Sequence, residues 1–503
     1  MLRARTMDSL HDLVGQRFVV DFPGTELGPE VERLVREGRV GGVILFPKNV
    51  TSPEQVRTLV ADLQRLAREA SLPPLWITVD QEGGWVNALR DVPLCPSPMA
   101  LGASGEEADA YKAGRITGSV LRWLGVNANH APVLDVNTNP RNPVIGPRSF
   151  GEDPRAVARL GCAYLRGLRS CGVLGIVKHF PGHGDTGVDS HLDLPVVRKE
   201  RAELERVELA PFRASLEAGA EALMTAHVLY PALDPDLPAT FSSRILRDLL
   251  RGEMGFEGAV FTDALGMGAV RRRWNRAEAV VHSLRAGADV VLNLGSPEEQ
   301  WAGIEAAREA ARDGRLAPAD LDGSMRRLCR LKDRYAVPPP PEPPSLAELR
   351  RSALHLARRG VTLVRAGRVP LPPGPAAVLS LGLGETAREV FVGELRAHLP
   401  RVEVVPSAGE MEPEVWETLV VLTPGWRETA YTDTVRKLWA RYRDRLVVVG
   451  AGAPYELAAF PEVHSYLVAY GPDPASLRAA AWALVGRLSP TGRLPVTVPG
   501  AVP

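Results

Sequence analysis

The chain has 503 residues, which is too many for one hydrophobic core and predicts two or three domains. Lysine plus arginine balances aspartate plus glutamate, 60 against 60, which argues against nucleic acid or an anionic membrane surface as a partner. The four cysteines are scattered, and no segment reaches the roughly 20 apolar residues that span a bilayer. No apolar stretch of signal-peptide length follows the basic N-terminus, so we expect a cytoplasmic protein that acts on a small or neutral molecule.

Eight short apolar runs alternate with helical segments along the first part of the chain. The strand candidates are residues 18–21, 42–46, 75–80, 126–129, 175–179, 222–227, 259–263 and 289–293. Helix-like stretches rich in Ala, Leu, Arg and Glu lie between them, at 53–70, 106–124, 154–170, 201–218, 242–254 and 276–286. This alternation predicts parallel strands with right-handed crossovers. Eight strands favour an α/β fold of the closed (β/α)8 TIM-type barrel kind, with an open doubly wound sheet as the alternative.

Polar residues stand at the ends of six of these strand candidates. They are Asp80, Asn129, Lys178 with His179, His227, Asp263 and Asn293. A single such residue is well explained as a helix cap. Active sites of barrel enzymes lie at the carboxyl ends of the strands, so six polar ends on one rim predict an active site there.

A run of prolines gives the strongest domain boundary. After a last barrel helix at 318–335, residues 337–344 read VPPPPEPP, which suits neither a helix nor a central strand and predicts a stiff linker. We therefore expect a catalytic barrel at 1–337, a linker at 338–345 and a second domain at 346–503. Strand candidates at 376–383, 418–423, 446–450 and 465–469 alternate with helices such as 474–485, which predicts a three-layer αβα sandwich. Its glycine clusters lack the spacing of a dinucleotide site and fit simple βα turns.

The segment 178–191, KHFPGHGDTGVDSH, gathers many ionisable groups directly after an apolar strand. Burying such groups is costly, which favours a site over a scaffold. Several of its residues are possible metal ligands, namely His179, His183, Asp185, Asp189 and His191. Their spacing fits no standard zinc pattern, so a metal loop is the alternative and we expect neither a metal nor an organic cofactor. For His183 and Asp185 we favour a role in shaping the loop.

Two groups of polar residues suit the cleavage of an acetal. Asp263 ends an apolar strand, which would hold it rigidly enough to serve as a nucleophile. The leaving oxygen also needs a proton, and histidine can supply one because its ordinary pKa of about 6.5 lies near neutrality. His191 follows Asp189 by two residues, and in a turn the carboxylate can orient the imidazole and support its protonated form.

The chain resembles glycoside hydrolase family 3, and specifically its bacterial β-N-acetylglucosaminidase (β-N-acetylhexosaminidase) branch. The resemblance rests on the loop 178–185, KHFPGHGD, with the later sequence DSH at 189–191. It extends to segments 41–46, 79–84, 131–136, 148–151 and 261–263, and to GRLPV at 492–496, which resembles the close of that family's second domain.

The resemblance implies that Asp263 is the nucleophile, that His191 is the acid/base and that Asp189 is the partner of His191. It also implies that the hydroxyl groups of the terminal sugar are bound by Asp80, Arg148, Lys178 and His179. A guanidinium, an ammonium and a carboxylate suit such directional hydrogen bonding to a polyol. One departure is Trp85, because the family usually has arginine after the sequence QEGG. Arg90 could take over that role, and Trp85 could either stack on the sugar or belong to the core.

The implied activity is a retaining exo-glycosidase that hydrolyses terminal β-linked N-acetylglucosamine by double displacement, acting on peptidoglycan fragments in cell-wall recycling. The rival enzymes are a β-glucosidase, which the DSH sequence argues against, and a phosphorylase. A histidine acid/base does not repel an incoming phosphate as a carboxylate would, so phosphorolysis stays open. A non-catalytic sugar-binding module is the alternative outside enzymes. The sequence does not predict the oligomeric state.

Overall fold

The structure is a computed structural model, and it describes residues 10–410, 415–425 and 430–500. Eight parallel strands form its first sheet, in the order β10-β1-β2-β3-β6-β7-β8-β9. They are β1 (Phe18–Val20), β2 (Gly42–Leu45), β3 (Trp76–Val79), β6 (Ala128–Asn129), β7 (Leu174–Phe180), β8 (Ala222–Thr225), β9 (Ala259–Phe261) and β10 (Val291–Leu292). A parallel bridge between Phe261 and Val290 joins β9 to the start of β10. The predicted barrel is confirmed, with all eight strand candidates in place.

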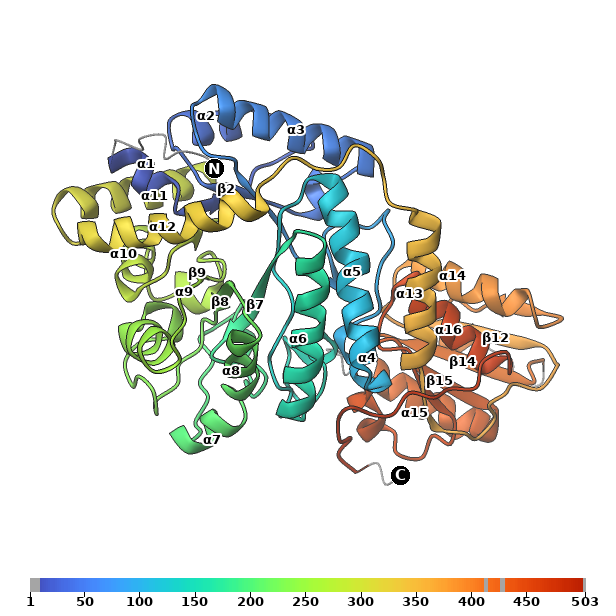
Figure 1. The fold of residues 1–503 in the computed structure, drawn as a ribbon. Coiled ribbons are helices and arrows are strands. Elements are labelled where there is room, and N and C mark those ends of the chain that lie inside the picture. Colours follow the sequence, from blue (N-terminus) through green and yellow to red (C-terminus); the bar gives the residue numbers. More distant parts are fainter. Residues whose placement is uncertain (1–9, 411–414, 426–429, 501–503) are drawn as a thin grey trace.

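Helices surround this sheet on the outside (Figure 1). They are α1 (Leu10–Gly15), α2 (Pro29–Arg36), α3 (Pro53–Glu69), α4 (Pro98–Ser104), α5 (Glu107–Leu124), α6 (Pro154–Ser170), α7 (Arg201–Arg206), α8 (Ala210–Glu217), α9 (Gly268–Arg271), α10 (Arg276–Ala286), α11 (Pro297–Arg312) and α12 (Pro318–Tyr335), with a π-helix at Arg244–Glu253. Several begin with a capping side chain followed by proline, as Ser52 and Asp153 do for α3 and α6. The single helix predicted at 201–218 was wrong, because the chain breaks at 207–209, just before Pro211 in the first turn of α8.

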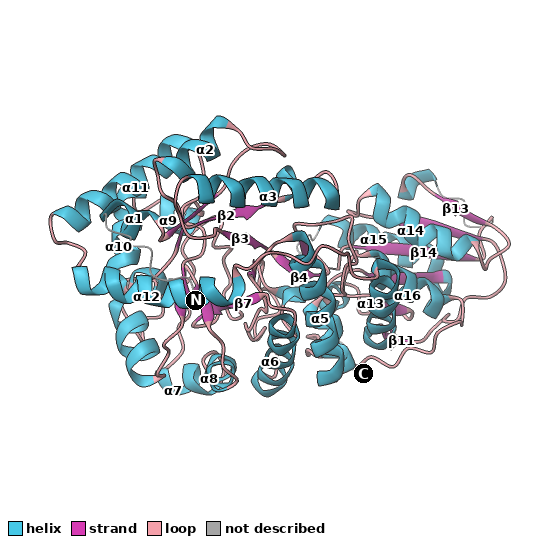
Figure 2. Ribbon diagram, turned by 45° about the horizontal axis from the view of Figure 1, so that its top comes forward, coloured by secondary structure: helices cyan, strands magenta, loops and turns pink. Residues whose placement is uncertain are grey.

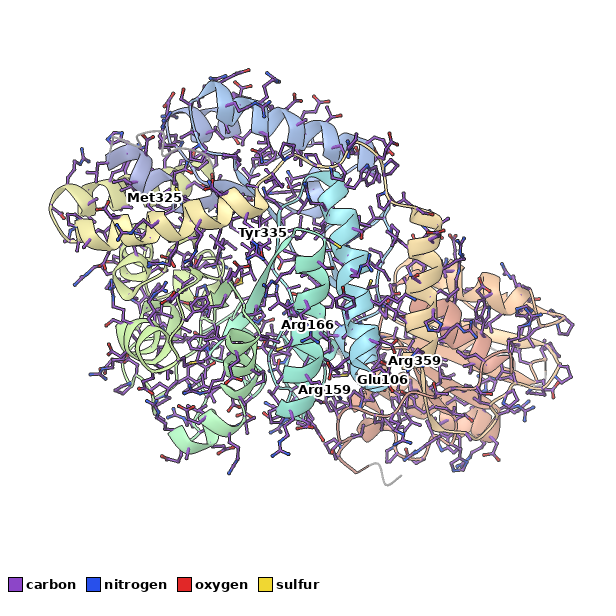
Figure 3. All side chains as sticks on the ribbon, in the orientation of Figure 1. Glu106, Arg159, Arg166, Met325, Tyr335 and Arg359 are labelled. Atoms are coloured by element: carbon purple, nitrogen blue, oxygen red, sulfur yellow. The ribbon has the colours of Figure 1, made fainter. Side chains whose placement is uncertain are left out.

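The inside of the barrel is filled by apolar side chains from successive strands. Val19, Ile44, Trp76 and Phe261 belong to one buried cluster, which also includes Met325 and Tyr335 of α12. Figure 3 shows these two α12 residues beside the barrel strands. A filled interior means that the barrel has no pore, and it leaves only the rim of the strands for a site.

The second sheet has six strands in the order β11-β16-β15-β14-β12-β13. The strands are β11 (Thr362–Arg365), β12 (Ala376–Ser380), β13 (Val402–Val404), β14 (Thr418–Thr423), β15 (Leu446–Gly450) and β16 (Tyr466–Val468). Only β11 runs antiparallel to its neighbour. Helices α13 (Leu346–Gly360), α14 (Glu385–Arg396), α15 (Ala430–Tyr442) and α16 (Pro474–Leu484) cover it, as Figure 2 shows in cyan around magenta strands.

Alternate residues of β14 give this sheet two buried faces. Leu419 and Val421 pack in one apolar cluster, whereas Val420 and Leu422 pack in another on the opposite side. The predicted three-layer sandwich is therefore confirmed. No strand was predicted for β11 or β13, which are short and lie at the two edges of the sheet.

The sandwich packs directly against the carboxyl-end side of the barrel. Met99, Ala100 and Ala103 of α4 share a buried cluster with sandwich residues such as Tyr470. The segment after α16 crosses back to the barrel, where the side-chain hydroxyl of Thr497 donates to Glu152 at 2.6 Å. Within the described part of the chain, no helix has the length and apolarity needed to cross a membrane.

Candidate active site

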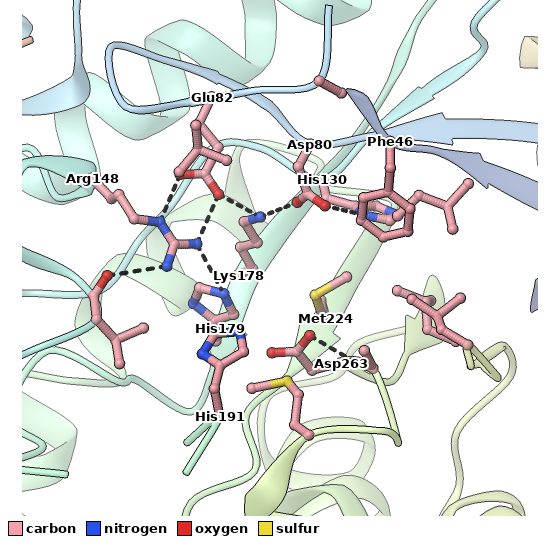
Figure 4. A pocket seen from close by; sticks show the side chains of 18 of the residues that line it. Phe46, Asp80, Glu82, His130, Arg148, Lys178, His179, His191, Met224 and Asp263 are labelled. Carbon is pink, nitrogen blue, oxygen red and sulfur yellow. Dashed lines mark hydrogen bonds and ion pairs between the residues drawn. The ribbon is translucent and has the colours of Figure 1, made fainter. Parts of the chain in front are cut away.

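Loops at the carboxyl ends of the barrel strands enclose a cavity of about 520 Å³. Its wall contains six of the predicted site residues, namely Asp80, Arg148, Lys178, His179, His191 and Asp263. The seventh, Asp189, contacts His191 from behind. Figure 4 shows the six wall residues around one space. The volume is typical of a small-molecule site.

The Lys178 ammonium lies between two carboxylates. Its Nζ is 2.6 Å from Asp80 Oδ1 and 2.6 Å from Glu82 Oε1, and the lysine side chain is only 2% exposed. Burial alone would raise the pKa of Asp80, but the Lys178 ammonium and the neighbouring His130 ring hold this pKa well below its usual value. The pair therefore presents a fixed donor and a fixed acceptor to the cavity at neutral pH.

Glu82 also binds Arg148 through two parallel hydrogen bonds. Arg148 Nε donates to Glu82 Oε2 and its Nη2 to Oε1, both at 2.8 Å, with both side chains buried. Such a bidentate pair fixes the plane of the guanidinium. Burial opposes the charged form of Glu82, yet Arg148 and Lys178 lower its pKa below the usual value.

His179 is oriented by a fully buried carboxylate, Asp135. The ring Nδ1 lies 2.7 Å from Asp135 Oδ2, and Arg148 Nη2 lies 3.4 Å from the ring Nε2. Because the carboxylate accepts and the guanidinium donates, these partners assign the proton to Nδ1. Asp135 also accepts the backbone N–H groups of His179 and His183, at 3.2 and 2.6 Å, which ties the start of the loop to the barrel.

Asp263 follows β9 and lines the cavity near Met224 and His179 (Figure 4). Its Oδ1 accepts the N–H of Ala264 at 2.7 Å. Burial would raise the pKa of Asp263, but the adjacent imidazoles of His179 and His227 lower it below its usual value. The carboxyl group is therefore ionised at neutral pH.

Asp189 and His191 form the pair that the sequence predicted. Asp189 Oδ1 lies 2.8 Å from His191 Nδ1 and accepts the His191 backbone N–H, also at 2.8 Å. The pair turns the ring Nε2 away from Asp189, and the ring lines the same cavity as Asp263. The His191 side chain is 60% exposed, so its proton can exchange with solvent through the open side of the cavity.

The loop that carries this pair lies against α9. Gly268 and Ala269 donate their N–H groups to the carbonyls of His191 and Ser190, at 3.1 and 3.0 Å. A Cβ atom on Gly268 would lie 2.4 Å from the His191 carbonyl oxygen, which only glycine avoids. The position of His191 therefore depends on a close backbone contact with the segment after Asp263.

His183 and Asp185 serve the loop itself. His183 is fully buried and contacts the hydroxyls of Thr186 and Ser190, at 2.8 and 3.0 Å, and burial lowers its pKa to about 4. Asp185 accepts from Thr138 at 2.7 Å. Across residues 10–410, 415–425 and 430–500, no group of three or more His, Cys, Asp or Glu is arranged to hold a metal ion.

Trp85 links the cavity to the sandwich. Its ring lines the cavity, and its Nε1 donates to the carbonyl of Ala451, after β15, at 2.8 Å. Nearby, Asn137 donates to the hydroxyl of Tyr455 at 2.7 Å. Trp85 is thus neither simply core nor simply a free stacking platform, because it also contacts the second sheet's loops.

The sequence did not single out Glu82, Asp135 or His130. Glu82 follows Asp80 by two residues, which places both side chains on one face of an extended segment. This alternation was a usable signal for Glu82. The hydrogen bonds of Asp135 and the position of His130 3.6 Å from Asp80 depend on which strands are neighbours, and the sequence does not give that by itself.

Comparisons with known proteins show the family of the chain. Residues 10–331 match the Glycosyl hydrolase family 3 N terminal domain. The chain is 37% identical over 337 residues to Beta-hexosaminidase A of Pseudoalteromonas piscicida, covering 62% of this chain and 56% of that protein. It thus spans little more than half the length of that relative. It is 42% identical over 287 residues to a Beta-hexosaminidase of Alkalilimnicola ehrlichii, covering 56% of this chain and 81% of that protein.

Solved structures also match almost the whole chain, and one of them is similar in sequence as well. It is a glycoside hydrolase family 3 beta-N-acetylglucosaminidase from Paenibacillus sp. str. FPU-7, with a TM-score of 0.93 and 37% identity. The match covers 97% of this chain and 99% of that chain, so it includes both the barrel and the sandwich.

Proposed function

Since the chain belongs to glycosyl hydrolase family 3, we propose that it is a retaining exo-β-N-acetylglucosaminidase that releases terminal β-linked N-acetylglucosamine. The observation that carries this proposal is the presence of an ionised carboxylate, Asp263, and the Asp189–His191 pair around one cavity. Retaining hydrolysis needs a nucleophile and a separate acid/base, and these two groups suit the two roles.

In the proposed first step, Asp263 attacks the anomeric carbon while His191 Nε2 protonates the leaving glycosidic oxygen. In the second step, His191 takes a proton from water, the water attacks the same carbon and Asp263 leaves. Two inversions restore the β configuration. The contact of Asp189 with Nδ1 supports this assignment, because it orients the ring and leaves Nε2 for the cavity.

The sugar-binding role of Asp80, Arg148, Lys178 and His179 is also part of the proposal. Lys178 and Arg148 can donate to hydroxyl oxygens, and Asp80 can accept from hydroxyl groups. Their mutual ion pairs hold these side chains in place before a sugar arrives, which reduces the entropy lost on binding.

We place the natural substrates among peptidoglycan fragments that end in N-acetylglucosamine, and the protein in the cytoplasm, as the family resemblance of the barrel motifs implies. No metal or organic cofactor enters the proposed steps. Cell fractionation would test the proposed location, and digestion of purified muropeptides would test the proposed substrates.

The test of the reaction is a panel of aryl glycosides. We expect turnover of the β-N-acetylglucosaminide well above that of the β-glucoside, β-N-acetylgalactosaminide and β-xyloside. Asp263→Asn should lower kcat by at least about 10³-fold, because the nucleophile is lost. Asp189→Asn should lower kcat less for a dinitrophenyl than for a methyl aglycone, because a good leaving group needs little protonation.

Three outcomes would contradict the proposal. One is near-normal turnover by Asp263→Asn, and another is an α anomer as the first product in a proton NMR time course. The third is a faster reaction in phosphate buffer that yields sugar 1-phosphate, which would make the enzyme a phosphorylase. Each outcome removes a different part of the mechanism.

A further inference from the structure

A second, smaller cavity adjoins the proposed active site. Its volume is about 190 Å³, and it lies where the barrel segment 90–94 meets α13 and the start of α16. Arg90 lines both this cavity and the 520 Å³ cavity that contains Asp263. The two spaces are therefore neighbours that share one wall residue.

Four arginines line the smaller cavity, namely Arg90, Arg350, Arg351 and Arg478. No acidic residue of the described chain is among its lining residues. Apolar groups such as Leu94 and Leu354 make up much of the rest. Four positive charges around one concavity, without a carboxylate in its wall, create a strongly positive potential.

Two of these arginines have no internal partner for their side chains. Within residues 10–410, 415–425 and 430–500, no side-chain hydrogen bond or ion pair involves Arg90 or Arg350. Arg351 lies 3.9 Å from Glu348, and Arg478 lies 3.2 Å from Glu394, so these two are partly neutralised. The acidic neighbours Asp91 and Asp473 do not line the cavity.

We propose that this cavity, defined by Arg90, Arg350, Arg351 and Arg478, binds an anionic group on the aglycone of the substrate. The inference rests on the proposed function, since it assigns the part of the substrate that leaves with the glycosidic oxygen. A carboxylate or a phosphate ester suits the cavity, because guanidinium groups bind both through paired hydrogen bonds. The Leu94 and Leu354 side chains would contact an apolar part of the same aglycone.

The position of the cavity explains why the aglycone is the part it receives. The proposed sugar-binding groups and Asp263 line the larger cavity, so a group that enters the smaller cavity must extend past Arg90, the residue that both cavities share. One wall of the smaller cavity, α13 and α16, belongs to the sandwich. The sandwich would then contribute to substrate selection although the proposed catalytic residues all lie on the barrel.

The test compares two matched substrates. One is an aryl β-N-acetylglucosaminide whose aglycone carries a carboxylate on a linker, in a series of increasing linker length. The other is the methyl ester of the same compound. We expect the wild type to prefer the acid, and Arg90→Gln and Arg350→Gln each to raise KM for the acid about three- to tenfold. Arg350 lines only the smaller cavity, so Arg350→Gln should leave kcat for the ester unchanged. The preference should weaken with added salt.

Arg312→Gln is the control variant. Arg312 is exposed on α11, far from the sandwich in Figure 1, and its side chain has no hydrogen-bond or ion-pair partner among the described residues. It should leave both substrates unaffected. Equal kcat/KM for acid and ester at every linker length would overturn the proposal, as would an acid preference that Arg90→Gln and Arg350→Gln leave intact.

A binding measurement separates this inference from the proposed function. The carboxylated aglycone alone should bind the wild type in calorimetry, and the Arg90→Gln/Arg350→Gln double variant at least about tenfold more weakly. This holds even if no aryl N-acetylglucosaminide is turned over, which would refute only the hydrolysis. If inorganic phosphate instead accelerates cleavage of the ester, and the double variant loses that effect, the cavity serves free phosphate and the aglycone proposal fails.

Discussion

At the scale of single residues, the candidate site is a chain of ion pairs. Lys178 joins Asp80 to Glu82, and Glu82 joins Lys178 to Arg148, all in a buried setting. Buried charges are stable only when they are paired, so each member holds the next in place. Glu82, which the sequence analysis did not single out, therefore holds both Lys178 and Arg148 in position.

Glu456 is a buried carboxyl group outside the proposed active site. It is buried in the sandwich, where Thr423 and Tyr466 donate to its Oε1 at 2.6 and 2.8 Å. Burial raises its pKa to about 7. The folded state therefore keeps a proton on Glu456 over a pH range in which the unfolded chain has lost it.

This shift predicts how stability depends on pH. The folded state should become less stable as the pH rises from about 4.5 through 7. In this range Glu456 ionises in the unfolded chain first, which lowers the free energy of the unfolded state relative to the folded one. In Glu456→Gln that slope should flatten, so that the variant gains up to a few kcal/mol relative to the wild type between pH 5 and 8. Denaturant unfolding at several pH values would measure it, and parallel curves would contradict it.

At the scale of elements, the acid/base loop depends on α9. Gly268→Ala should displace the His191 carbonyl, because the added Cβ would lie 2.4 Å from it. We expect kcat to fall roughly tenfold to a hundredfold with little loss of stability, since a small displacement of the proton donor lowers the rate more than it destabilises the fold. Kinetics of the variant would test this, with Gly28→Ala as a control for a new methyl group, because a Cβ there meets no atom within 4 Å and the Gly28 backbone has a φ of −116°. Full activity of Gly268→Ala would contradict this prediction, because it would show that the position of His191 does not depend on the close contact with Gly268.

The elements also show what the sequence could predict. Apolar runs located every barrel strand, since parallel strands covered on both sides are apolar throughout. They also located four sandwich strands, whereas β11 and β13 are short edge strands with partly exposed residues and give a weaker signal. The seven proposed site residues were found from strand ends and motifs. The sequence could not identify Asp135 and His130 as their partners, because these contacts depend on which strands are neighbours and not on spacing along the chain.

At the scale of the whole molecule, the segment 338–345 between α12 and α13, which we propose as the boundary of two domains, predicts how the chain responds to cutting. The linker is exposed, although Arg122 donates to the carbonyls of Val337 and Pro338 at its start. The barrel and sandwich also meet through the α4 cluster and through Trp85, neither of which involves the linker. A protease site inserted at 341–344 should therefore give two fragments that elute together and retain most activity. Separation of the fragments on a sizing column would contradict this.

The pairing of β1 with β10 has a consequence for synthesis of the chain. Val19 pairs with Leu292, so the ring cannot close until the ribosome has released residues near 292. Until then the growing sheet has two open edges, which are the surfaces that aggregate most readily. The Trp85 contact comes later still, because Ala451 follows by 366 residues. The cavity is thus lined by residues between 44 and 294, whereas Trp85 in its wall finds its sandwich partner only after residue 451 is made. Nascent chains that stall between these points should be the ones that need chaperones.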